Sequence, residues 1–150
     1  MVEATIADGA TVDYATFIEG IELQHFWLAG AEMKNLAGPH QPEHLRIKVA
    51  DAGSEWKIVK DGFVIFQTYL IRFVESDDEQ RVGEITATFG LEYTSLVQPT
   101  ESMSNSFTRH NVPLNVWPYF RELVASMTGR MGWEILTIPT YKIAADRPRS

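Results

Sequence analysis

The sequence predicts an α+β fold in which a four-stranded antiparallel sheet is packed by one main C-terminal helix. Four strand-like runs lie between residues 21 and 97, and their alternation of apolar and polar residues is typical of strands. The dipeptide Asp61-Gly62 separates two of these runs and is typical of a hairpin turn. Residues 115–133 then show apolar side chains at helical spacing. Hairpin-like connections between successive strands would give an antiparallel sheet with one wet face.

The first two strands are predicted from alternation and from the breaks that follow it. The first begins at Ile21 and ends before residues 35–42, where one glycine and two prolines disfavour a strand. The second covers residues 45–49, with apolar residues at every second position. Residues 51–55 interrupt it, and we expect Trp56 to resume the same strand beyond a bulge.

The third and fourth strands have the stronger patterns. Residues 63–76 follow the hairpin dipeptide and are rich in aromatic and branched side chains, and the acidic turn at 76–80 ends this run. The fourth run has the clearest alternation, which predicts one buried and one wet face. The predicted buried face carries Ile85, Ala87, Phe89, Leu91, Tyr93 and Val97; the predicted wet face carries Glu84, Thr86, Thr88, Glu92 and Thr94.

The helix is predicted over residues 115–133 and should cover the dry face of the sheet. Asn115 is the expected N-cap, and Pro118 is tolerated because a first-turn N–H has no partner within the helix. Gly129 or Gly132 should end it. A short helical turn is expected before it, around residues 103–109. The apolar stripe of the main helix comprises Val116, Phe120, Leu123, Val124, Met127 and Met131.

The length of 150 residues and the composition predict a single domain over 1–150, with a flexible lead-in at 1–16 and a polar tail at 142–150. The formal net charge of −7 argues against binding to nucleic acid phosphates or to an anionic membrane surface. The chain has no cysteine, which excludes disulfides. The first 30 residues contain no lysine or arginine, unlike a signal peptide, and no run is long enough to span a membrane. We therefore expect a cytoplasmic protein.

The sequence shows no pattern typical of a catalytic or metal site. His40 and His44 are four residues apart, but Pro42 between them disfavours the helix that would bring them together, so exposed loop histidines are expected. The glycines match neither a dinucleotide fingerprint nor a phosphate-binding loop. Surface ion pairing explains Arg121 and Glu122 better than catalysis does. We expect no catalytic residue, no metal and no cofactor, and an enzyme is the minority hypothesis.

Aromatic side chains make up 11% of the chain, and many lie on strands whose other face is already apolar. Most of them should fill the core. One helix, however, is too little to cover both faces of a four-stranded sheet. The remaining apolar surface implies oligomer contacts, a groove for apolar ligands, or both.

The predicted helix resembles the signature helix of the SecB protein-export chaperone family. In that family an asparagine, a short apolar run and Pro-Tyr-x-Arg-Glu open the helix, and a Ser-Met pair, an arginine and an aromatic residue follow. The order of four strands before the helix is also similar, over about residues 18 to 139. The matching positions here are Asn115, Pro118, Tyr119, Arg121, Glu122, Ser126, Met127, Arg130 and Trp133.

The resemblance implies an ATP-independent holdase, a tetramer built as a dimer of dimers, that binds unfolded preproteins in apolar grooves and delivers them to the SecA motor. An acidic sheet surface makes the SecA contact in the family, and Glu84 and Glu92 are the candidates here. The expected oligomer interface comprises Trp117, Tyr119, Arg121, Glu122 and Met127. The expected client groove comprises Phe26, Trp27, Phe63, Phe66, Tyr69 and Trp133.

The sequence also departs from the family. Residues 136–141 match a segment after which family members continue into a second long helix and an acidic tail. Residues 142–150 are basic and too few for that helix, so docking to SecA through a tail is not expected. Three alternatives stay open: a SecB-like chaperone dedicated to an antitoxin or another single client, an apolar small-molecule binding domain, and a purely structural assembly subunit.

Overall fold

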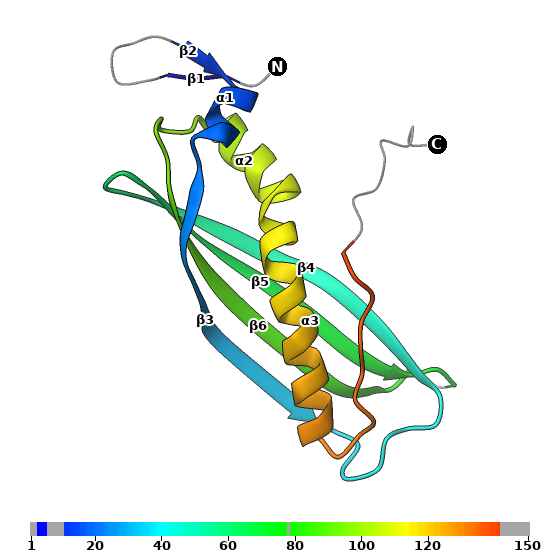
Figure 1. Cartoon of the computed structure of the whole chain (residues 1–150). Coiled ribbons are helices and arrows are strands. Elements are labelled where there is room, and N and C mark those ends of the chain that lie inside the picture. Colours follow the sequence, from blue (N-terminus) through cyan, green and yellow to red (C-terminus); the bar gives the residue numbers. More distant parts are fainter. Residues whose placement is uncertain (1–2, 6–10, 78, 142–150) are drawn as a thin grey trace, which may run out of the picture.

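Four long strands form one antiparallel sheet, in the order β3-β6-β5-β4 (Figure 1). The computed structural model describes residues 3–5, 11–77 and 79–141. The α+β architecture predicted from the sequence, with helices across one face of this sheet, is confirmed. The strands are β3 (Glu22–Asn35), β4 (Leu45–Val59), β5 (Gly62–Glu75) and β6 (Arg81–Thr94).

The connections between strands are of two kinds. β4 and β5 form a hairpin whose turn residue Asp61 has a φ of 65°, and β5 and β6 form the next antiparallel pair. The expected hairpin-like connection between the first two strands is wrong, because β3 and β4 lie at opposite edges of the sheet. Residues 36–44 instead carry the chain from one edge to the other, and their prolines and glycine suit a long loop better than a tight turn.

The bulge predicted in the second strand is confirmed. The pairing of β4 with β5 shifts between Asp51 and Ser54, where Gly53 has a φ of +112° that few residues other than glycine adopt. The Asp51 carboxylate accepts hydrogen bonds from the backbone N–H of Gly53 and from the buried amide of Gln67. β4 thus continues beyond the bulge, through Trp56, to the hairpin.

Helices α2 (Glu101–His110) and α3 (Val112–Arg130) lie end to end across one face of the sheet, which we call the inner face (Figure 1). α2 extends the predicted turn, and the Thr100 hydroxyl caps it by accepting a hydrogen bond from the Met103 N–H. α3 begins before Asn115, because Pro113 lies in its first turn and does not break the helix. Asn115 is therefore no N-cap, and its amide donates to the Tyr93 hydroxyl (2.8 Å).

The core lies between these helices and the two central strands. The predicted burial of alternate β6 residues is confirmed for Ile85 to Tyr93, whereas Val97 lies beyond the strand. The helical stripe is confirmed as well: four of its residues are buried, and Leu123 and Met127 are half-buried against the core. The largest fully buried apolar side chains include Phe17, Phe63, Phe73, Phe120, Ile65, Ile71, Ile85, Leu91, Met103 and Ile138.

Part of the expected flexible lead-in forms regular structure. β1 (Glu3–Thr5) pairs with β2 (Thr11–Asp13), and α1 (Tyr14–Glu19) follows, capped by Asp13. The reason lies just beyond the predicted boundary: Phe17 is 1% exposed and its ring packs against Phe63 and Phe107. Residues 1–2 and 6–10 of the lead-in, and the predicted tail at 142–150, lie outside the described residues.

Candidate binding surfaces of the sheet

The two helices cover β5 and β6 but leave the inner face of both edge strands largely exposed. Residues directly opposite each other on neighbouring strands share a face, so the pairing identifies the inner-face residues of β3 and β4. The inner face of β3 carries an apolar strip, here called the β3 strip: Leu23, Phe26, Leu28 and Met33. That of β4 carries the β4 strip: Leu45, Ile47 and Val49.

The β3 strip lies alongside α3, with Phe26 beside Tyr119 and the end of β3 near Met131. Leu23 is 41% and Leu28 47% exposed, which is high for leucines on a strand's apolar face. The ring of Phe26 stacks on that of Tyr119, with 4.1 Å between centroids, and on that of Phe89. Tyr119 itself is 54% exposed, so its ring connects the β3 strip to the exposed surface of α3.

The β4 strip lies at the opposite edge of the sheet, toward the C-terminal segment 131–141, which runs back along α3 (Figure 1). Ile47 is 37% and Val49 43% exposed. Ile58, on the same face at the far end of β4, is 51% exposed. Apolar side chains therefore line both edges of the inner face, with α3 between them.

Two side chains of α3 hold the C-terminal segment in place. Trp117 Nε1 donates to the backbone carbonyl of Pro139, and Arg121 Nε donates to that of Ile138, both at 2.7 Å. Ile138 is 1% exposed, so the segment is part of the core. Of the residues predicted for an oligomer interface, Trp117 and Arg121 thus have partners within the chain, and Met127 is half-buried. Tyr119 and Glu122 are exposed, although one side of the Tyr119 ring stacks on Phe26.

The six residues predicted to form one client groove do not line one surface. Phe63, Tyr69 and Trp133 are buried, with at most 6% exposure. Phe26 belongs to the β3 strip. Trp27 and Phe66 lie on the opposite side of the sheet, which we call the outer face. The alternation indicated that each strand had two apolar faces at these positions, but not which face the helices would cover.

The outer face carries an exposed aromatic pair. Trp27 and Phe66 lie on either side of Gly90 in one cross-strand row, and their rings meet edge to face with centroids 5.9 Å apart. A Cβ atom at Gly90 would overlap the indole ring of Trp27, so only glycine lets this ring lie flat on β6. Trp27 is nevertheless 37% exposed.

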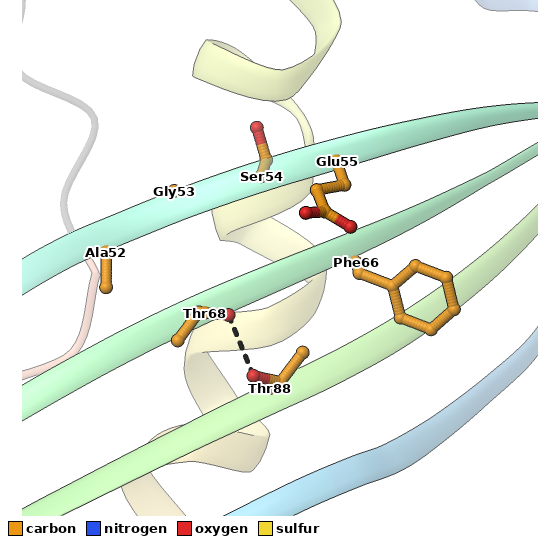
Figure 2. A pocket seen from close by; sticks show the side chains of 7 residues that line it. All are labelled: Ala52, Gly53, Ser54, Glu55, Phe66, Thr68 and Thr88. Atoms are coloured by element: carbon orange, nitrogen blue, oxygen red, sulfur yellow. Dashed lines mark hydrogen bonds between the residues drawn. The ribbon is translucent and has the colours of Figure 1, made fainter.

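Beside Phe66 the outer face is hollowed by the β4 bulge (Figure 2). The hollow has a volume of about 530 Å³. Thr68 and Thr88 line it and hydrogen-bond to each other (2.7 Å), and Glu55 borders it near Phe66. The small side chains of Ala52, Gly53 and Ser54, at the β4 bulge, do not fill this space. The lining residues are Ala52, Gly53, Ser54, Glu55, Phe66, Thr68 and Thr88.

The two glutamates predicted to contact SecA also lie on the outer face, but two arginines compensate the charge of Glu84. The Glu84 carboxylate lies 3.0 Å from Arg81 and 3.5 Å from Arg72. The Glu92 carboxylate lies 2.7 Å from His25 Nδ1. The surroundings of Glu84 are therefore not the acidic surface that the resemblance implies.

The largest pKa shifts among the described residues belong to two tyrosines of the core. Burial raises the pKa of Tyr93 to about 12 and also raises the pKa of Tyr69, so both phenols are neutral in the core. The Tyr93 hydroxyl accepts a hydrogen bond from Asn115, whereas the buried Tyr69 hydroxyl has no hydrogen-bond partner among the described residues. His40 and His44 are exposed in the crossover loop, as predicted. Within residues 3–5, 11–77 and 79–141, no three histidine, aspartate or glutamate side chains come together to hold a metal ion. In the same ranges, no helix has the length and apolar character to cross a bilayer.

No protein-family model matches the sequence, and no curated protein is similar to it at the sequence level. A solved structure is similar in fold: the Mycobacterium tuberculosis Rv1957 SecB-like chaperone in complex with a ChAD peptide from the Rv1956 HigA1 antitoxin. The TM-score is 0.74 at 16% sequence identity, over 85% of this chain and 95% of that chain. The four-stranded antiparallel sheet with its bent pair of helices across one face is thus the SecB-like fold.

Proposed function

We propose that the protein is an ATP-independent chaperone of the holdase type, which binds extended segments of unfolded polypeptides on the inner face of its sheet. One observation carries the proposal: an exposed apolar strip lies along each edge strand, beside a strand edge that pairs with no other described strand. An unfolded client offers apolar side chains and free backbone groups. A strip next to an open edge can bind both without requiring a particular client sequence.

The two strips suit different roles. The β3 strip already receives the ring of Tyr119, and this ring is itself 54% exposed on the side of α3 that faces β3. We assign this continuous apolar surface to contacts between subunits, in a tetramer built as a dimer of dimers. The β4 strip has no such aromatic cover from α3, and we assign it to the client.

A second function is a chaperone dedicated to one client, such as an antitoxin. The structure of Rv1957 with an antitoxin peptide favours this candidate, because it places such a peptide on the same fold. Delivery to the Sec translocase rests on the sequence resemblance alone. Contact of Glu84 and Glu92 with SecA stays a prediction, and the two arginines beside Glu84 weaken the electrostatic argument for that residue.

The test of holdase activity is light scattering of a chemically unfolded, aggregating client with no nucleotide added. We expect the protein to suppress scattering near stoichiometric ratios. Val49→Asp should remove most of this effect, because it puts a charge into the β4 strip. Ala50→Asp is the matched control: it makes the same charge change one residue later, on the outer face, and should suppress as the unchanged protein does. Equal activity of both variants would contradict the assignment of the β4 strip.

The test of the subunit interface is the mass in solution, by light scattering coupled to size-exclusion chromatography. Tyr119→Ala removes the exposed ring that stacks on Phe26 and should shift the protein to smaller oligomers. Val49→Asp, on the other edge, should leave the mass unchanged. A tetramer that persists in Tyr119→Ala would contradict the assignment of the β3 strip.

A further inference from the structure

The outer face of the sheet carries a row of basic side chains. The strand pairing places Lys48, Arg72, Glu84 and Lys34 side by side across β4, β5, β6 and β3. Arg81 adds a fourth base, which shares the Glu84 carboxylate with Arg72. We call these residues the basic row.

The basic row keeps a positive surplus after its ion pairs are counted. Lys34 pairs with Glu32 at 3.4 Å, so four basic groups face two carboxylates. Beyond the end of the row lies the acidic turn at 76–80, in which Glu79 pairs with Arg46: the pKa of Glu79 is lowered by the hydrogen bond from Arg46 and by the charges of Arg46 and Lys48. The surplus is notable in a chain whose net charge is −7. This positive surplus favours a negatively charged partner at this part of the surface.

The hollow beside Phe66 lies on the same face, next to the basic row. Thr68 in the hollow and Arg72 in the row are four residues apart on β5, which corresponds to about 13 Å along an extended strand. Phe66, whose ring contacts Trp27, lines the far side of the hollow, and Glu55 makes that side acidic. An apolar group in the hollow and negative groups over the row would therefore be about four extended residues apart.

Arg72 and Arg81 share a single carboxylate, that of Glu84. They suit a partner that brings further carboxylates, because a guanidinium can bind a carboxylate through two parallel hydrogen bonds. A long nucleic acid would match the row locally, but the chain as a whole repels a polyanion. A short acidic polypeptide segment would contact only the basic row and the hollow, and would avoid the acidic remainder of the surface. Its apolar residue would also bury the exposed part of Phe66.

We propose that the outer face docks an acidic polypeptide segment of a partner protein, with one apolar side chain in the hollow and carboxylates on the basic row. This face is opposite to the proposed client strip. The inference goes beyond the proposed function and does not depend on it.

The experiment measures fluorescence anisotropy of a labelled short peptide that carries one leucine and, about four residues away, three consecutive glutamates. We expect binding that weakens at high salt. Lys48→Glu should weaken it about tenfold, and Ala52→Trp should weaken it by filling the hollow. Lys60→Glu makes the same charge change in the exposed β4–β5 turn and should have no effect. Val49→Asp should also bind normally, which separates this site from the client strip.

Each other outcome counts against the proposal. Absence of binding to the intact protein overturns it, as does equal binding of a peptide in which lysines replace the glutamates. Unchanged affinity in both Lys48→Glu and Ala52→Trp would show that the peptide binds elsewhere. If a short single-stranded RNA displaces the peptide and itself loses affinity in Lys48→Glu, the row is a general anion site and the assignment to a polypeptide is wrong.

Discussion

The central strands and the edge strands have similar apolar patterns but very different burial. On β5, Ile65 and Ile71 are completely buried, whereas on β4 Ile58 and Val49 of the same face are 51% and 43% exposed. The difference is one of width: a helix with its side chains is about 10 Å across, while neighbouring strands are about 4.8 Å apart. A single line of helices therefore covers two strands and leaves an edge on either side. In this fold the uncovered edges are what makes binding surfaces available.

The sharpest test of this comparison is one substitution made on both kinds of strand. Ile65→Ala empties a fully buried site between the sheet and the helices and should lower the free energy of unfolding by about 2–5 kcal/mol. Ile58→Ala, at a half-exposed site on the same face, should cost less than about 1 kcal/mol. Urea denaturation followed by circular dichroism measures both. Similar losses would mean that the edge strand is covered in solution, for example by another subunit.

Glycines on the outer face provide the second test. Gly90→Ala on central β6 would displace the Trp27 ring from the backbone of β6 and should lower the free energy of unfolding by about 1–3 kcal/mol. Gly30→Ala on edge strand β3 places its methyl group in open space and should be close to neutral. Thermal denaturation compares the two, and the fluorescence of Trp27 in a variant without the other tryptophans reports the displacement. A neutral Gly90→Ala would mean that Trp27 does not rest on β6 in solution.

A third test uses the phenol of Tyr93, on central β6. Burial raises its folded-state pKa to about 12, above the unfolded value of 10.0. Because the raised pKa belongs to the folded state, its stabilising contribution is complete below about pH 10 and is lost as the pH rises toward 12. We expect a loss on the order of 1 kcal/mol at about pH 11. Tyr93→Phe should show a smaller loss over this range in urea denaturation, and an equal loss would assign it to other groups.

The smallest effect is expected at the exposed ion pair between β3 and β6. Glu92→Gln removes the partner of His25, whose side chain is 73% exposed. Surface pairs of this kind contribute well under about 1 kcal/mol, so the unfolding midpoint should hardly change. A clear loss of stability would indicate that this part of the edge is buried in an assembly.

The sequence predicted the local structure well, because hairpin dipeptides, alternation and helical spacing are local signals. The β4 bulge, the Asp61 turn and the helical stripe were all expected and are all present. The helical turn around residues 103–109 was expected to be separate from the main helix, but only Asn111 separates α2 from α3, since the proline at 113 lies in a first turn and removes no hydrogen bond there. The crossover from β3 to β4 was missed, because strand order depends on pairing between distant segments.

The candidate surfaces were harder to predict. Trp27, Phe66 and Phe63 were assigned to one groove, yet they lie on two faces and at different depths. A strand with apolar residues on both faces gives no signal for which face a helix will cover. Glu84 was expected to belong to an acidic surface. Two arginines pair with it, Arg72 from β5 and Arg81 from β6, and the pairing with β5 depends on the strand register.

By itself the sequence determined the α+β class, the four strands, the helix with its apolar stripe, and the resemblance to the SecB family. These depend on neighbours within a few residues, where side-chain spacing and turn chemistry act directly. Only the tertiary structure decided that β3 and β4 are the edges, that the helices cover the two strands between them, and that basic groups surround Glu84. Such features arise when segments far apart in the chain pack together, and no local pattern encodes which pairs will meet.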